Sequence, residues 1–271
     1  MVPARILVIA GSDSGGGAGI QADIKTIAML GGHPMTAITA LTAQNTLGVS
    51  GVMPVPSDFV VAQIDAVMSD LGADAVKIGM IGSAEVAERV ADRLVGFAPL
   101  PLVFDPVMVA TSGAVLADEA TIAAFERLMA IAALVTPNLP ELAALTGRGI
   151  DDLAGLEAAA LALAGRTGAA VLAKGGHLPG KLLTDVLAHD GRILHRWEAE
   201  RIETTNTHGT GCTLASGIAA LLGRGHALID AVTGAREYVQ AAILRAPGLG
   251  GGHGPLSHVL GTVPWELARR V

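Results

Sequence analysis

The stretch RILVIAG at residues 5–11 places five consecutive apolar residues between an arginine and a glycine. A strand with one face in water would alternate apolar and polar side chains. An unbroken apolar run therefore predicts a strand covered on both faces, as in a parallel sheet. Five other short runs are nearly all apolar and do not alternate: MTAITAL (35–41), AVKIG (75–79), LVFDPV (102–107), ALVTPN (133–138) and AVLAKGG (170–176).

Helical patterns separate these runs. Ser57 is a suitable N-cap, and after it Val60, Ile64, Val67 and Leu71 form an apolar stripe at helical spacing. Further helices are predicted at 83–95, 118–131, 151–166, 211–223 and 226–245.

The segment 184–197 alternates around Asp190 and Gly191, which predicts a β-hairpin. Strands that alternate with helices indicate an α/β fold, with a central, mostly parallel sheet flanked by helices. Because no long linker, repeat or low-complexity tract interrupts the pattern, we expect one domain over residues 1–271.

The composition narrows the function classes. The net charge is −7 without a basic tract, and aromatic residues make up 3%, which argues against a nucleic-acid-binding surface. No apolar window of about 18 residues predicts a membrane span, and the first apolar run lacks the features of a signal peptide. The single cysteine, Cys212, excludes an internal disulfide and a multi-cysteine zinc site. A cytoplasmic location is the default expectation.

Polar and glycine residues gather where the predicted strands end. Ligands bind at the carboxyl ends of the strands in parallel sheets, so these loops predict one composite site. The loops are AGSDSGGGAG (10–19), TAQN (42–45), KIGM (77–80), DPVM (105–108), TPNLPE (136–141), AKGGH (173–177) and NTHGTGC (206–212).

The loop NTHGTGC leads into a predicted helix. Free N–H groups around Gly209 and Gly211 are suited to bind phosphate oxygens. Cys212 falls in the first helical turn, where we expect the helix dipole to lower the pKa of its thiol. A thiolate there would act as a base toward a bound hydroxyl, or Cys212 only holds position or fills space. His208 is a candidate supporting residue.

Asn138 and Glu141 lie one helical turn apart. This spacing suits Mg²⁺ completed by water and phosphate oxygens, and it equally suits a capping box at a helix start. Asp105 ends an apolar run, where a carboxylate requires a partner, exposure or a metal. Lys174 could reach phosphates as a point charge. Either of the last two could instead form an ordinary salt bridge.

A second glycine-rich loop, SGGGAGIQADIK (14–25), runs into a helix that contains Asp23. It matches neither the Walker pattern nor a clean GxGxxG. Gln44 follows the second predicted strand, and its amide both donates and accepts hydrogen bonds. That suits the edge of a heterocycle, although such a residue is more often part of an ordinary loop.

Taken together and in this order, the motifs closely resemble the bacterial hydroxymethylpyrimidine/phosphomethylpyrimidine kinases of thiamine biosynthesis, in the ribokinase-like superfamily. The resemblance covers nearly the whole chain. Its motifs are AGSDSGGGAGIQADIKT (10–26), TALTAQNT (39–46), KIGM (77–80), FDPVM (104–108), TPNLPE (136–141), KGGH (174–177), NTHGTGCT (206–213) and GHGPLSH (252–258).

This resemblance implies a three-layer ribokinase-like fold and an ATP-dependent kinase that acts twice. It would phosphorylate 4-amino-5-hydroxymethyl-2-methylpyrimidine to the monophosphate and then the monophosphate to the diphosphate. ATP as phosphoryl donor, Mg²⁺ and a homodimer are implied as well.

The resemblance also implies roles for individual residues at the acceptor. Gln44 would hydrogen-bond the pyrimidine edge, with Asp23 and Gly11 in the same pocket. Met80 and Val107 would flank the ring.

At the phosphoryl group, the resemblance implies an anion hole formed by Gly209, Gly211 and Cys212. Lys174 would neutralise the ATP phosphates. The remaining implied residues are Asn138 and Thr207 for the nucleotide, and Glu141 and Asp105 for the metal.

Two positions depart from the family pattern. Thr111 stands where many members have a lysine in a segment, 105–116, that we predict to be a lid hinged near Gly113. Related pyridoxal kinases can use an extra cysteine in this lid, where Ala110 stands here. The pyrimidine is therefore the expected acceptor.

Three other functions compete with this interpretation. The first is a pyridoxal/pyridoxine kinase of the same fold. The second is a non-catalytic nucleotide sensor, which the intact set of Lys174, Glu141 and Cys212 disfavours. The third is a dinucleotide-dependent oxidoreductase, which needs a proper GxGxxG followed by an acidic residue.

Overall fold

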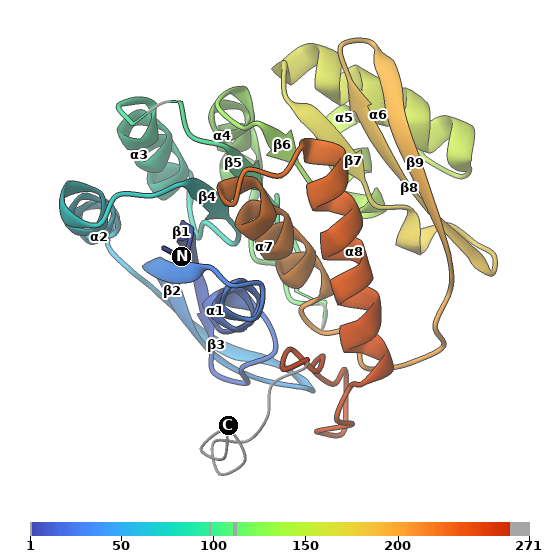
Figure 1. Ribbon diagram of the computed structural model, residues 1–271, viewed down its shortest axis with the longest axis horizontal. Helices are drawn as coiled ribbons and strands as arrows, with labels where there is room; N and C mark the ends of the chain where they lie inside the picture. The colour runs from blue at the N-terminus through green and yellow to red at the C-terminus, as the bar shows by residue number, and fades with distance from the viewer. Residues whose placement is uncertain (1, 98, 111–112, 261–271) are drawn as a thin grey trace.

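The computed structural model describes residues 2–97, 99–110 and 113–260 (Figure 1). Within these residues nine strands form one sheet, in the order β3-β2-β1-β4-β5-β6-β7-β8-β9. The strands are β1 (Arg5–Asp13), β2 (His33–Asn45), β3 (Gly48–Pro54), β4 (Ala75–Ile78), β5 (Leu102–Phe104), β6 (Leu134–Val135), β7 (Ala170–Ala173), β8 (Leu182–His189) and β9 (Arg192–Glu200).

The six apolar runs form the parallel part of the sheet, as predicted: β2, β1, β4, β5, β6 and β7 pair parallel to their neighbours. Strands β5 and β6 are shorter than their apolar runs. Both end just before a proline, Pro106 or Pro137, which has no N–H for the strand ladder. The polar residues that follow are thereby freed to line a site.

Antiparallel strands complete both edges. The predicted hairpin is confirmed as β8 and β9, joined by Asp190 and Gly191 with φ of 49° and 71°, the left-handed values that a tight two-residue turn requires. The edge strand β3 was not predicted. Its sequence, GVSGVMP, is rich in glycine, and it pairs antiparallel with β2.

Eight α-helices lie in the described chain, with a short 3₁₀ turn at Gly175–His177. They are α1 (Gly19–Met29), α2 (Ser57–Asp70), α3 (Ala84–Val95), α4 (Glu119–Ala130), α5 (Leu139–Thr146), α6 (Leu153–Thr167), α7 (Thr210–Gly223) and α8 (Leu228–Leu244). None of them is long and apolar enough to cross a membrane.

The helices cover both faces of the sheet. Helices α1, α7 and α8 bury their apolar residues against one face, and α7 lies between the other two (Figure 1). Helices α2 to α6 pack on the opposite face. Successive β1 residues alternate between the two cores: Ile6 and Val8 point to one, and Leu7 and Ile9 to the other. The predicted three-layer α/β architecture is confirmed.

One helix start differs from its prediction. Ser57 is the first residue of α2 instead of its cap, because Pro56 occupies the N-cap position and the Ser57 hydroxyl donates to the Glu85 carboxylate. Val60 and Ile64 are buried as expected, whereas Leu71 at the helix end is 43% exposed.

Candidate active site

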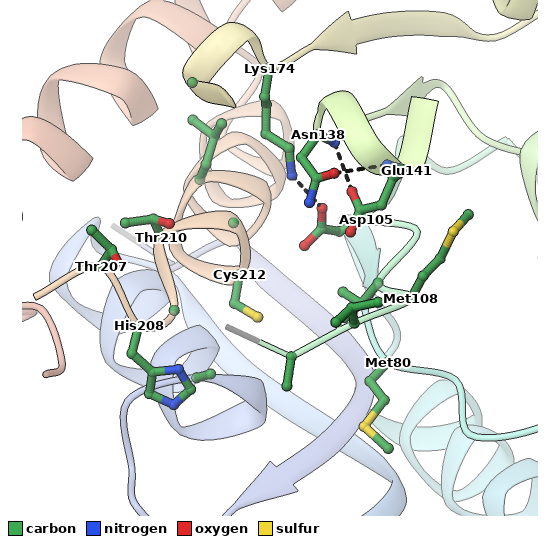
Figure 2. Close-up of a pocket in the computed structure, with 18 of the residues that line it drawn as sticks. Met80, Asp105, Met108, Asn138, Glu141, Lys174, Thr207, His208, Thr210 and Cys212 are labelled. Carbon is green, nitrogen blue, oxygen red and sulfur yellow. Dashed lines mark hydrogen bonds and ion pairs between the residues drawn. The ribbon is translucent and has the colours of Figure 1, made fainter. Parts of the chain in front are cut away.

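A cavity of about 960 Å³ opens at the carboxyl ends of the parallel strands. Figure 2 shows part of its lining, with Cys212 between the charged group at Lys174 and the ring of His208. Every predicted site residue except Asp23 lines this cavity: Gly11, Gln44, Met80, Asp105, Val107, Asn138, Glu141, Lys174, Thr207, Gly209, Gly211 and Cys212.

The N-terminus of α7 faces the cavity. Gly209 stands at its N-cap position with φ of 87°, and no side chain of the described residues caps this end. A Cβ on Gly209 would lie 1.9 Å from the Gly17 carbonyl oxygen, so only glycine fits between the two loops. The backbone N–H groups of the first turn therefore point into the cavity, where they can bind an anion.

Cys212 lies in that first turn and is partly exposed to the cavity. The expected lowering of its thiol pKa is wrong. Burial raises the pKa of Cys212 to about 11, and the negative charges of Asp23 and Asp105 add to the rise. The ammonium of Lys77 and the backbone N–H of Gly19 act in the opposite direction but do not outweigh them. The helix start alone is too weak to offset the loss of water around the sulfur.

Lys174 and Asp105 form an ion pair at the other side of Cys212. The Lys174 Nζ atom lies 3.0 Å from Asp105 Oδ1, which also accepts a 2.9 Å hydrogen bond from the Thr136 hydroxyl. Burial disfavours the ammonium, but Asp105 and Glu141 outweigh it and raise the pKa of Lys174. The Lys174 ammonium is thus held charged at the cavity wall.

Asn138 and Glu141 form a capping box at the start of α5. Asn138 Oδ1 accepts from the Glu141 N–H at 2.9 Å, and the Asn138 N–H donates to Glu141 Oε2 at 2.7 Å. The capping reading is therefore correct, yet Glu141 also lines the cavity. Burial raises the pKa of Glu141 to about 7, with Lys174 opposing the rise and Asp105 adding to it.

The predicted position of Asp23 was wrong. We expected its side chain in the substrate pocket, but it is fully buried and does not line the cavity. Its oxygens lie 2.9 and 3.0 Å from the Nζ atom of Lys77, and the Ser216 hydroxyl donates to it as well. Helix α1 turns Asp23 inward toward β4, because its outer face carries residues such as Ile24 and Lys25. Lys77, part of the KIGM motif, lines the cavity in its place.

The acceptor end is organised by Asp13, which the sequence analysis missed. Its carboxylate accepts backbone N–H groups from Gly15, Gly17 and Ala18 at 2.8 to 3.0 Å, and lies 2.9 Å from His208 Nε2. Burial opposes the ionised form, but these bonds outweigh it and lower the pKa of Asp13. An acidic residue at the head of a glycine loop was the available signal.

His208 connects this loop to the acceptor residues. Its Nε2 atom lies 3.4 Å from the Gln44 amide nitrogen, and the Gln44 amide oxygen accepts from the Thr42 hydroxyl at 3.1 Å. A Cβ on Gly17 would lie 2.4 Å from the His208 ring. His208 therefore lies beside Gln44, in the supporting position that the sequence predicted.

A C-terminal segment, 252–258, covers the same end. The His253 N–H donates to the Thr46 carbonyl at 3.0 Å, and the His208 N–H donates to the Gly254 carbonyl at 3.1 Å. His258 is buried against α7, with its Nε2 atom 2.9 Å from the Thr213 hydroxyl. This motif thus closes the acceptor end.

The predicted lid is described only in part, and Thr111 lies outside the described residues. Val109 and Val115 form a bridge, and the Ala110 N–H donates to the Ala114 carbonyl at 2.8 Å. Gly113 has φ of 88°, and Ala110 lines the cavity.

The fold and the cavity define a kinase of the ribokinase-like fold. Pyridoxal kinase of Bacillus subtilis, solved as an ADP complex, is 32% identical with a TM-score of 0.86, over 94% of this chain and 97% of that one.

The chain belongs to the phosphomethylpyrimidine kinase family, whose model matches residues 13–257. The hydroxymethylpyrimidine/phosphomethylpyrimidine kinase of Rhizobium meliloti is 54% identical, over 93% of this chain and 96% of its own length. The thiamine biosynthesis bifunctional protein ThiED of Geobacter sulfurreducens is 49% identical over 94% of this chain, which spans 52% of that longer protein.

Proposed function

We propose that the protein phosphorylates 4-amino-5-hydroxymethyl-2-methylpyrimidine with ATP, and then phosphorylates the monophosphate to the diphosphate, in thiamine biosynthesis. The observation that carries this proposal is the 54% identity to a kinase of that name over 96% of its length. The cavity supports it, because acceptor and phosphate residues line one continuous space.

The acceptor end is suited to a flat, polar-edged ring. Gln44 offers an amide that both donates and accepts, and Met80 and Val107 offer apolar surface for the ring faces. These residues would place the hydroxymethyl group toward Cys212.

The phosphate end supplies charge stabilisation without a basic surface. Phosphoryl transfer needs positioning and charge neutralisation more than covalent chemistry. We infer that the N–H groups around Gly209 and Gly211 hold the transferring phosphoryl group. Lys174 would neutralise the phosphates, and Asn138 and Thr207 would contact the nucleotide.

Cys212 would position the acceptor hydroxyl and take its proton as the new P–O bond forms. Because the thiol pKa is about 11, the resting group is a neutral thiol at neutral pH. A thiolate of such high pKa is a strong base once it forms, and proton transfer of this kind contributes about 10²–10⁴-fold to a rate.

The residues fit a magnesium ion. Asp105 and Glu141 place two nearly buried carboxylates beside one another. Burial is the main cause that raises the pKa of Glu141, and the negative charge of Asp105 adds to the rise. Mg²⁺ prefers one or two carboxylates completed by water and phosphate oxygens. Asp105 and Glu141 would hold it, and it would supply positive charge that neutralises the phosphates during transfer.

The wider assignments are also proposals: one kinase unit over residues 1–271, located in the cytoplasm and active as a homodimer. The edge strand β3 supports the homodimer. Val52 and Met53 on it are 48% and 62% exposed, and Leu47 in the preceding turn is 72% exposed. An apolar sheet edge of this kind is usually covered by another chain.

The second candidate is a pyridoxal kinase, favoured by the similarity of the fold to the Bacillus subtilis enzyme. Two observations oppose it. The identity to that protein is 32%, against 54% for the pyrimidine kinase. Moreover, Ala110 lines the cavity and Cys212 is the only cysteine in the chain, so no lid cysteine can engage an aldehyde.

A product assay tests the proposal. Wild type and Cys212→Ser are given Mg-ATP with either hydroxymethylpyrimidine or pyridoxal, and the products are resolved by chromatography. Pyrimidine mono- and diphosphate are expected from the wild type, with a strong loss in the variant. Pyridoxal phosphate alone would assign the protein to the second candidate, and an unimpaired variant would remove Cys212 from the chemistry.

A further inference from the structure

A buried ion pair lies beneath the catalytic cysteine. Lys77 stands near the end of β4 and Asp23 on α1, and both side chains are 0% exposed. The Lys77 Nζ atom lies within 3.0 Å of both Asp23 oxygens, and the Lys77 side chain lines the floor of the cavity. The function proposed above leaves both residues without a task.

Stability does not account for this pair. Removing two charges from water costs several kcal/mol, and apolar residues of similar volume often serve as well or better in such a place. The chain also reserves space for the ammonium, since a Cβ on Gly79 would lie 2.7 Å from Lys77 Nζ.

The pair is connected to Cys212 through two elements. On α7, the Ser216 hydroxyl donates to the Cys212 carbonyl at 2.8 Å and also contacts Asp23. On α1, Gly19 lies one turn before Asp23, and its N–H faces the Cys212 sulfur. The lysine, the aspartate and the thiol are therefore held as one unit.

Four charged groups act on the sulfur from the surrounding elements. Lys77 on β4 favours a negative charge on it, whereas Asp23 on α1 and Asp105 after β5 oppose one. Lys174 after β7 interacts with it from the phosphate side. Among these, Lys77 is the largest favourable charge on Cys212.

We propose that the Lys77–Asp23 pair sets the charge state of Cys212, with Lys77 as a positioning residue that stabilises the thiolate and Asp23 as the residue that holds and tempers the ammonium. In the reaction, the Cys212 thiol first loses its proton to water, and the thiolate then takes the acceptor hydroxyl proton and becomes a thiol again. The hydroxyl oxygen bonds to phosphorus, and ADP leaves with the electrons of the broken P–O bond. This step rests on the proposed function, whereas the charge state of Cys212 does not.

Because Cys212 is the only cysteine, alkylation of the whole protein reports on this one sulfur. The experiment follows the rate of alkylation by iodoacetamide from pH 7 to 10. The proteins are wild type, Asp23→Asn and the double variant Asp23→Asn/Lys77→Met, which removes both charges and keeps the volume. At a fixed pH, each unit by which the thiol pKa rises lowers the thiolate concentration about tenfold. The remaining thiolate is more nucleophilic, so the alkylation rate falls only about threefold.

The expected order of rates is Asp23→Asn fastest, wild type intermediate and the double variant slowest. Coincident rates, or a double variant faster than wild type, would overturn the proposal. The matched control is Arg5→Met/Asp74→Asn, which removes an ion pair of 2.7 Å remote from the cavity and should alkylate at the wild-type rate. Equal rates in denaturant verify that the differences belong to the folded state.

Kinetics supply a second readout that a merely structural role would not move. In the double variant kcat should fall about tenfold or more while both KM values stay within about twofold, and raising the pH should restore part of kcat. Equal losses at every pH would overturn the proposal.

If the alkylation order holds but no pyrimidine is phosphorylated, the proposal for the Lys77–Asp23 pair stands and the proposed function fails. If pyrimidine turnover is normal and the rates coincide, only the pair fails.

Discussion

The cavity is flanked by two lysine–aspartate pairs that are nearly identical in contact and different in surroundings. Lys77 lies 2.9 Å from Asp23 and Lys174 lies 3.0 Å from Asp105, and each lysine stands at or just after the end of a parallel strand. Each aspartate also accepts from a hydroxyl, Ser216 in the first pair and Thr136 in the second.

Exposure separates the two pairs. The side chains of Lys77 and Asp23 are 0% exposed, whereas Lys174 is 15% exposed and opens onto the cavity. A sealed ammonium cannot exchange its partner for a ligand, so it acts as a fixed charge. An open one can turn from its carboxylate to a phosphate. We therefore expect the same kind of ion pair to act as a fixed charge in one place and to bind a ligand in the other.

The largest expected effect is the loss of the sealed lysine. Lys77→Met leaves the Asp23 carboxylate buried and unpaired, which should lower the free energy of unfolding by about 3–5 kcal/mol. Urea unfolding measures this, and Asp23→Asn/Lys77→Met should recover most of the loss. If Lys77→Met is as stable as wild type, the comparison fails, because the burial of Asp23 without its partner would then cost no stability.

Lys174, the open lysine, should matter more for activity than for stability. Lys174→Met should lower kcat by about 10²–10³-fold, the usual effect of removing one group that stabilises developing charge. The unfolding free energy should fall by less than in Lys77→Met, because removal of the partly exposed Lys174 side chain opens Asp105, which is itself only 3% exposed, to water in the cavity. Steady-state kinetics and urea unfolding on the same preparation measure both. A stability loss as large as that of Lys77→Met would mean that the two pairs do not differ.

The pH dependence of stability sharpens the contrast, because the open pair borders Glu141, whose pKa is raised to about 7. The pKa of Glu141 is raised to about 7, so between its ordinary value and about 7 the folded protein binds more protons than the unfolded chain. The unfolding free energy therefore falls as the pH rises through this range, by at most about 3 kcal/mol.

Urea unfolding at pH 5 and pH 8 tests this effect. Glu141→Gln keeps an acceptor for the capping box and should lack this part of the pH dependence. Glu88→Gln, exposed on α3, should keep the wild-type dependence. Parallel pH profiles for wild type and Glu141→Gln would show that Glu141 does not titrate in this range.

The smallest effects concern the two hydroxyls. Ser216→Ala and Thr136→Val each remove one hydrogen bond to a buried carboxylate, and each should cost about 1.5 kcal/mol in urea unfolding. Only Ser216→Ala should also alter the alkylation rate of Cys212, because only Ser216 bonds both to Asp23 and to the Cys212 backbone. An equal change in the alkylation rate with Thr136→Val would show that the two hydroxyls do not differ in their effect on Cys212.

The sequence was sufficient for the parallel core and most of the cavity. Runs such as 6–10 and 102–104 are apolar throughout, which indicates a strand between two layers, and the polar residues after them meet at one edge of the sheet. Strand β3 escaped prediction because glycine, serine and proline interrupt its short apolar stretches in GVSGVMP. It is a strand only because β2 offers it backbone partners.

The errors within the site arise from contacts between distant residues. Asp23 and Lys77 are 54 positions apart, and locally one is a helix residue and the other a strand residue. Only the packing of α1 over β1 and β4 buries them together. The direction of the Cys212 pKa was wrong for the same reason, because a helix start is visible in the sequence and the surrounding desolvation is not. For Asn138 and Glu141 the sequence offered two predictions, a capping box and a place in the site. The structure shows the capping box, and both residues also line the cavity.

The segment 252–258 has a consequence for how the molecule is made. It joins Thr46 near the start of the chain to His208 and to the turn at Asn206, whose amide oxygen leaves no room for a side chain at Gly254. A ribosome delivers residues in order, and folding follows the emerging chain. The sheet and the turn at 206–212 are thus synthesised before the cover of the acceptor end exists. Acceptor-end residues such as Gly11 and Gln44 emerge early, and the segment that covers them emerges only after that turn.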